Sequence, residues 1–140
     1  MQQGSKVVLD TNIVISAAIS TDGTPAKVFE LFLGKKIVNF TSEEIIGEVK
    51  EVINRPFFKD YIPDEYKRFI LDNFKLLSVV IRPSFNEDAV PEDKADNKFI
   101  NCALTAKADI ISGNKHLLNL KEYKGVKIKS AREFFDRFNL

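Results

Sequence analysis

The stretch VVLDTNIVISAAIS, residues 7–20, contains the residues that decide the fold. Its apolar start predicts a buried strand, and this strand ends at a carboxylate, Asp10, which two small polar residues follow. A buried carboxylate is unfavourable unless hydrogen bonds or a cation compensate its charge. Taken alone, Asp10 is compatible with two roles: it can cap the helix that follows, or it can belong to a binding site.

Apolar runs alternate with helical patterns along the rest of the chain, which is typical of a parallel α/β sheet. Strands are predicted at 6–10, 36–40, 78–82, 109–112 and 126–129. The main helices are predicted at 12–19, 24–34, 41–54, 63–77 and 94–107, with a short helix in GNKHLL and an amphipathic one after Ser130. Thr24 and Thr41 are the expected N-caps of the second and third helices. We predict a three-layer α/β/α fold with a parallel sheet of about five strands, formed by a single domain, 1–140.

Composition narrows the class of protein. The formal net charge of +1 gives no overall attraction for nucleic acid, so any basic surface must be local. The single cysteine, Cys102, excludes an intramolecular disulfide and suits a reducing compartment. No apolar stretch approaches the length of a membrane span, and the start MQQGSKVVLD lacks the pattern of a secretory signal. We expect a cytoplasmic protein that does not associate with membranes.

Several polar side chains are expected to meet at one edge of the sheet. In open parallel sheets, ligands bind beyond the carboxyl ends of the strands. Asp10 ends the first strand, and Asn114 follows the strand 109–112 by one glycine. Helical phase places Asp96 on the inward face of its helix and Glu48 at the margin of an apolar stripe. These side chains therefore form a candidate site.

Each acid also has a simpler explanation. Asp10 and Asp93 can be N-caps, Asp96 can be a first-turn acid favoured by the helix dipole, and Glu48 can be a solvated surface residue. Their convergence favours a site, because clustered carboxylates repel one another unless a cation neutralises them. Oxygen ligands alone suit Mg²⁺ or Mn²⁺ rather than zinc.

Three blocks of the chain resemble the PIN-domain family. LDTN at 9–12 resembles the first motif of the family, with its acid at Asp10. SEEIIGEVKEVINRPFF at 42–58 resembles the helix of the second acid, which falls on Glu48. PEDKADNKFINCALTAKADIISGNKHLL at 91–118 resembles the most diagnostic block, whose third acid falls on Asp96. The segments GTPAKVFELF and NRPFF are most similar to the VapC-like branch of toxin–antitoxin systems.

The resemblance implies a metal-dependent endoribonuclease that hydrolyses phosphodiester bonds of single-stranded RNA. It also implies an antitoxin protein as partner and a homodimer. Asp10 and Asp96 would be the principal ligands of Mg²⁺ or Mn²⁺, and Glu48 would ligate the metal or orient the attacking water. Most members carry a fourth acid where this chain has Asn114, which would be a weakened contact. Asp93 would add charge at the rim.

Substrate contacts are expected beside these acids. Thr11 and Asn12 would orient the acids or a phosphate by hydrogen bonds. The chain from residue 107 onward carries eight Lys and Arg against four Asp and Glu, which fits a solvated surface or, as the second explanation, a rim that binds the phosphate backbone. Lys115 is the best candidate for a phosphate contact, because it stands beside the proposed site. His116, the only histidine, is interpreted as turn structure. RPFFKDY at 55–61 has the composition of a base-stacking surface, although packing under a helix junction or a dimer or antitoxin interface is the favoured interpretation.

Two other functions remain open at this point. Asn114 favours a PIN-like module that binds RNA or a protein without cleaving, whereas the three retained acids favour the enzyme. A phosphatase with Asp10 as nucleophile is the third option. Its haloacid-dehalogenase-like version is disfavoured, because Asn12 stands where that class has a second acid.

Overall fold

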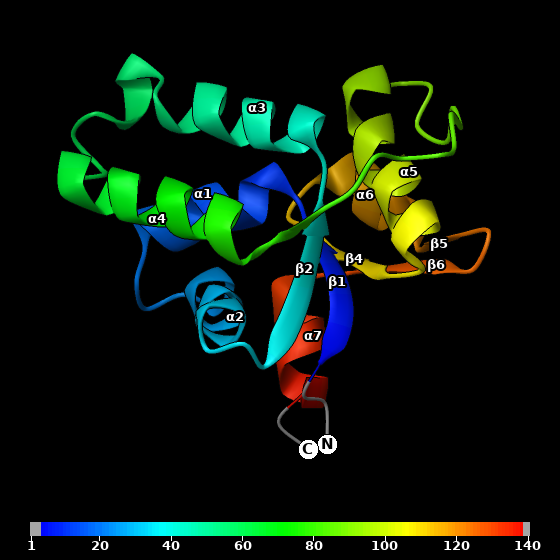
Figure 1. The fold of residues 1–140 in the computed structure, drawn as a ribbon, viewed down its shortest axis with the longest axis horizontal. Coiled ribbons are helices and arrows are strands. Elements are labelled where there is room, and N and C mark those ends of the chain that lie inside the picture. The colour runs from blue at the N-terminus through cyan, green and yellow to red at the C-terminus, as the bar shows by residue number, and fades with distance from the viewer. Residues whose placement is uncertain (1–3, 139–140) are drawn as a thin grey trace.

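The described residues, 4–138 of the computed structural model, have the predicted three-layer α/β/α architecture (Figure 1). The strands are β1 (Ser5–Leu9), β2 (Ile37–Thr41), β3 (Val79–Val80), β4 (Asp109–Ile111), β5 (Glu122–Tyr123) and β6 (Val126–Lys129). The α-helices are α1 (Thr11–Ile19), α2 (Thr24–Leu33), α3 (Glu43–Ile53), α4 (Asp64–Leu77), α5 (Asn97–Ala106), α6 (Lys115–Leu120) and α7 (Ala131–Phe138). Two 3₁₀ turns, η1 (Pro56–Phe58) and η2 (Lys94–Asp96), precede α4 and α5. Positions 1–3 and 139–140 of the predicted domain lie outside the described residues.

The strand β1 lies in the interior of the sheet, whose strand order is β3-β2-β1-β4-β6-β5. It pairs in parallel with β2 on one side and with β4 on the other. Val7, Val8 and Leu9 are fully buried, as expected for a parallel strand that helices cover on both faces. Among residues 4–138, five strands are parallel and β5 alone is antiparallel. The expected parallel sheet is therefore confirmed.

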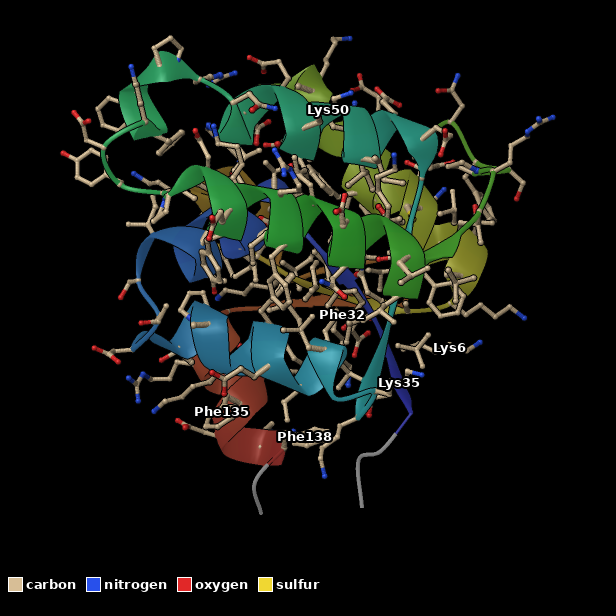
Figure 2. The ribbon with its side chains drawn as sticks, turned by 60° about the vertical axis from the view of Figure 1, so that its left-hand side comes forward. Lys6, Phe32, Lys35, Lys50, Phe135 and Phe138 are labelled. Carbon is tan, nitrogen blue, oxygen red and sulfur yellow. The ribbon has the colours of Figure 1, made fainter. Side chains whose placement is uncertain are left out.

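Helices cover both faces of this sheet. Figure 1 shows α1, α3 and α4 on one side and α5 and α6 on the other. The side chain of Phe32 on α2 lies against α4 (Figure 2), where its ring centroid is 6.2 Å from that of Phe74. The helix α7 packs against α2, and Figure 2 labels its Phe135 and Phe138. No helix within the described range is long and apolar enough to cross a bilayer. The carboxyl ends of β1 and β4 meet at one edge, where α1 and α6 begin.

The N-caps of α2 and α3 each differ by one residue from the predicted ones. Ser42, not Thr41, caps α3 and accepts a hydrogen bond from the N–H of Ile45 at 3.3 Å. Thr41 is instead the buried last residue of β2. Gly23, not Thr24, is the N-cap of α2. The Thr24 hydroxyl accepts a hydrogen bond from the guanidinium of Arg132 in α7, so a tertiary contact replaces the expected cap.

Two edge strands also differ from the prediction. The third strand has two residues, Val79–Val80, instead of the five at 78–82, and both are exposed because β3 lies at the edge of the sheet. The strand β5 was not predicted, because two residues carry no periodicity. Lys124 and Gly125, both at positive φ, form the turn between β5 and β6, which is the backbone conformation that tight hairpins require.

A row of polar side chains on α5, which we call the α5 ladder, holds the loop at residues 82–93. Asn97, Asn101 and Thr105 lie one helical turn apart and therefore on one face of the helix. They accept hydrogen bonds of 2.8, 2.7 and 2.9 Å from the backbone N–H groups of Val90, Glu87 and Ser84. The loop leads directly into η2, so the ladder positions the acidic residues there.

Replacing Asn101 by alanine tests the α5 ladder. The variant leaves the Glu87 N–H without its partner, and we expect the free energy of unfolding to fall by about 1–2 kcal/mol. Limited proteolysis within residues 82–93 should become faster. Asn73→Ala is the control, because the Asn73 amide donates only to the carbonyl of Phe69 within the solvent-facing side of α4. Equal losses of stability in both variants would contradict the proposed tethering.

Candidate metal site

Two hydrogen bonds hold the end of β1 at the carboxyl edge of the sheet. The N–H of Leu9 donates to Oδ1 of Asn39 at 2.8 Å, and the N–H of Asp10 donates to the carbonyl of Ile111 at 3.1 Å. Asn39 is fully buried on β2, and its amide also donates to the hydroxyl of Ser78 at 2.9 Å. Asp10 is therefore fixed from both neighbouring strands. Asn39 was not among the predicted site residues, because it stands within a predicted strand and belongs to no chemical motif.

The Asp10 carboxylate is 1% exposed and accepts three hydrogen bonds. Its Oδ1 accepts from the N–H of Ile13 at 2.9 Å, which makes it the N-cap of α1. Its Oδ2 accepts from the hydroxyl of Ser112 and from the N–H of Gly113 at 3.2 Å. A carboxylate has about four acceptor positions, so one remains for a further ligand. Burial raises the pKa of Asp10 to about 6, although these hydrogen bonds act in the opposite direction.

Asp96 brings a second buried carboxylate to the site. It is the last residue of η2 and is 6% exposed, as its helical phase predicts. Its Oδ2 is buried and has no hydrogen-bond partner among the described residues. The pKa of Asp96 is raised to about 6, chiefly by burial and next by the negative charge of Asp93, although the cationic Lys98 acts in the opposite direction. Burial and repulsion therefore disfavour the ionised form of Asp96 when no cation is bound.

Glu48 lies at the margin of α3, as predicted, but both of its oxygens have partners. Oε1 accepts a hydrogen bond from the hydroxyl of Thr11, and Oε2 lies 2.9 Å from Nζ of Lys98. Within residues 4–138, no three acidic, histidine or cysteine side chains come close enough to hold a metal together. Glu48 is thus engaged by the protein itself, and its role as a metal ligand stays a prediction.

Lys98 is the main residue of this site that the sequence analysis missed. Its side chain is only 6% exposed, and its ammonium also donates to the carbonyl of Ala95. The ammonium lies 5.2 Å from the ring centroid of Phe99. Lysine is rarely buried unless it is paired, and the partner of Lys98 lies in a distant segment, so its burial left no signal in the sequence.

Asn114 uses its side chain as the N-cap of α6. Its Oδ1 accepts from the N–H groups of His116 and Leu117, at 2.7 and 3.4 Å. The cap occupies the oxygen that was predicted to contact the metal, and its role as a ligand stays a prediction. Lys115 and His116 are exposed on α6, and Nδ1 of His116 lies 3.9 Å from a carboxylate oxygen of Glu92.

A cavity of about 220 Å³ brings the predicted site residues together. Seven of the eight line it, namely Asp10, Thr11, Asn12, Glu48, Asp93, Asp96 and Asn114, whereas Lys115 does not. Arg55 is the cationic residue in its wall, and its guanidinium is paired with the carboxylate of Glu51 at 2.8 and 2.9 Å. Phe57 and Tyr61, which follow Arg55, are 72% and 56% exposed, so they do not pack under a helix junction.

The fold and this acidic site define an α/β sandwich with carboxylates at the carboxyl edge of a parallel sheet. A family model for the PIN domain matches residues 6–116, and the chain belongs to this family. It is 38% identical over 142 aligned positions to the uncharacterized protein MJ1680 of Methanocaldococcus jannaschii, covering 95% of this chain and 91% of that protein.

The fold is also similar to that of a chain in the crystal structure of VapBC2 from Rickettsia felis bound to a DNA fragment from their promoter. The TM-score is 0.59, the identity is 16%, and the match covers 89% of this chain and 98% of that chain. At this level of identity, the likeness concerns the fold. The predicted family and fold class are confirmed.

Replacing Asp96 by asparagine tests the electrostatics of the metal-free site. A carboxyl pKa raised on folding contributes stability at low pH that is lost as the pH rises from 3.8 to about 6. We therefore expect Asp96→Asn to melt a few degrees higher than the parent at pH 7.5 without divalent metal. The difference should shrink toward pH 4.5. Asp72→Asn, at an exposed position of α4, is the control, and a variant less stable than the parent at pH 7.5 would contradict the assignment.

Proposed function

We propose that the protein is a nuclease that hydrolyses phosphodiester bonds of single-stranded RNA with Mg²⁺ or Mn²⁺ as cofactor. The observation that carries the proposal is the pair of buried carboxylates, Asp10 and Asp96, in one cavity at the carboxyl edge of the sheet. Membership of the PIN-domain family supports nuclease activity. RNA as the substrate class and the identity of the metal are part of the proposal.

The residues in the cavity fit a hard divalent cation. Mg²⁺ is commonly held by one or two carboxylates and keeps several waters. Asp10 has one free acceptor position, and Oδ2 of Asp96 is buried without a partner. When bound, the ion would lower the pKa of a water and neutralise charge on the phosphate. Asp10 and Asp96 would hold it, while the charge of Asp93 at the rim would add to the attraction.

Arg55 is the phosphate contact that we propose in addition to Lys115. It lines the cavity, and its pair with Glu51 is exposed on both sides. Exposed ion pairs contribute little to stability, so the guanidinium can exchange this carboxylate for a phosphate at small cost. Phe57 and Tyr61 are exposed next to it, with ring centroids 5.8 Å apart, and offer stacking surfaces for unpaired bases.

We further propose that the protein acts in the cytoplasm as the toxin of a toxin–antitoxin pair and forms a homodimer. The structural neighbour from Rickettsia felis is a VapBC2 complex, which supports an antitoxin protein as a partner. A module that binds RNA or a protein without cleaving is the alternative. It is favoured by the engagement of Glu48 with Lys98 and by the capping role of Asn114.

A cleavage assay on mixed single-stranded RNAs distinguishes the enzyme from the binding module. We expect the parent to cleave with Mn²⁺ or Mg²⁺ and not in EDTA. Asp10→Asn and Asp96→Asn should each lower the rate at least a hundredfold, because each removes charge from the proposed ligand set. Asp72→Asn is the control, and metal-dependent cleavage that survives in both site variants would contradict the site. Absence of cleavage by the parent on every RNA would favour the binding module.

RNA binding tests the role of Arg55 separately from cleavage. In the Asp10→Asn background, Arg55→Gln should weaken the binding of a single-stranded oligonucleotide and reduce the slope of log K against log salt by about 0.7, the value for one phosphate contact. Fluorescence anisotropy at several salt concentrations measures both quantities. Arg68→Gln, at an exposed position of α4, is the matched control. An unchanged slope in the Arg55 variant would remove this residue from the binding surface.

A further inference from the structure

The ion pair between Lys98 and Glu48 takes no part in the proposed binding of the metal by Asp10 and Asp96. Nζ of Lys98 lies 2.9 Å from Oε2 of Glu48, and the two side chains are 6% and 28% exposed. Lys98 is anchored further by the carbonyl of Ala95, and Glu48 by the hydroxyl of Thr11. An ion pair removed from water offsets the cost of desolvation only when further hydrogen bonds satisfy both of its side chains. Glu48 lines the cavity, and Lys98 holds it there from outside the cavity lining.

The charges around this pair suggest what the ammonium does. Asp93 and Glu48 both act electrostatically on Asp96, as do Lys98 and His116 with the opposite sign. Four carboxylates, those of Asp10, Glu48, Asp93 and Asp96, line one small cavity. The ammonium of Lys98 lies outside this lining and contacts Glu48, whereas Arg55, the cation in the lining, is paired with Glu51. In an all-carboxylate cluster, a second divalent ion would be the natural counter-charge for the outer acids. Here the ammonium of Lys98 already neutralises Glu48.

We propose that Lys98 takes the place of a second metal ion, so that the site binds one divalent ion, on Asp10 and Asp96, rather than two. Lys98 is a positioning residue in this account: it holds Glu48 away from the ion and keeps it as the acceptor of the Thr11 hydroxyl. Asn114 acts in the same direction, because the amide brings no charge and its Oδ1 caps α6. The inference rests on the proposed metal-dependent function.

Two variants distinguish the effect of the Lys98 charge from that of the Glu48 charge. Lys98→Met keeps the length of the side chain but leaves Glu48 uncompensated, so this variant should gain a second bound ion. The double variant Lys98→Met with Glu48→Gln removes both charges together and leaves the net charge of the site unchanged. It should bind one ion with an affinity close to that of the parent. Replacing a buried ion pair by neutral side chains of similar volume is commonly tolerated in folding.

The experiment is a titration of metal-free protein with Mn²⁺ at pH 7.5, followed by calorimetry and by the electron paramagnetic resonance signal of free Mn²⁺. We expect one ion per chain for the parent, two for Lys98→Met and one for the double variant. Lys94→Met, one turn earlier and paired with Asp88 at 3.4 Å, is the matched control and should bind one ion.

Each result bears on a different part of the account. Two ions per parent chain, or one ion in a folded Lys98→Met variant, would overturn the role of Lys98 while leaving metal dependence intact. A loss of affinity of tenfold or more in the double variant would do the same, because it would make Glu48 a direct ligand. No Mn²⁺ binding by the parent would overturn both this inference and the proposed cofactor. If Lys98→Met does not fold, two ions on the parent or a tenfold loss of affinity in the double variant would still overturn the role of Lys98.

Discussion

The buried carboxylate of Asp10 is the group on which the arrangement of the site depends. Its two oxygens join the first turn of α1 to Ser112 and Gly113, which follow β4. Ser112 lies 102 positions after Asp10 in the sequence. These hydrogen bonds connect the ends of two neighbouring parallel strands. Of the two roles that the sequence left open for Asp10, the structure shows the helix cap. The remaining acceptor position of the carboxylate is the one that the proposed metal would use.

The acids around Asp10 differ in how the charge of each carboxylate is compensated. Desolvation raises the pKa values of Asp10 and Asp96 to about 6, so both acids are under-compensated at neutral pH. The protein resolves the same problem differently at Glu48, where the buried ammonium of Lys98 supplies the positive charge. The cavity therefore has one acid with an internal counter-charge and two acids that require an external one, which is the physical basis of the proposed metal site.

The sequence predicted the residues whose positions follow from periodicity. Asp10 stands at the end of an apolar run, and the helical phases of Asp96 and Glu48 correctly gave one buried and one marginal position. Contacts that depend on the direction of a long or amide side chain were not predictable in this way. Lys98 turns inward to meet Glu48, and Asn39 replaces a strand partner for the N–H of Leu9. Neither contact leaves a pattern in a single sequence, because each partner lies in a distant segment.

The central claim is that Asp10 and Asp96 together hold a divalent metal ion. Its most direct test is anomalous diffraction at the manganese absorption edge from crystals of the parent protein soaked in Mn²⁺ near pH 7.5. The account predicts an anomalous peak in contact with the carboxylates of both residues, with Glu48 still paired to Lys98. A fully soaked crystal with no peak between Asp10 and Asp96 would contradict it.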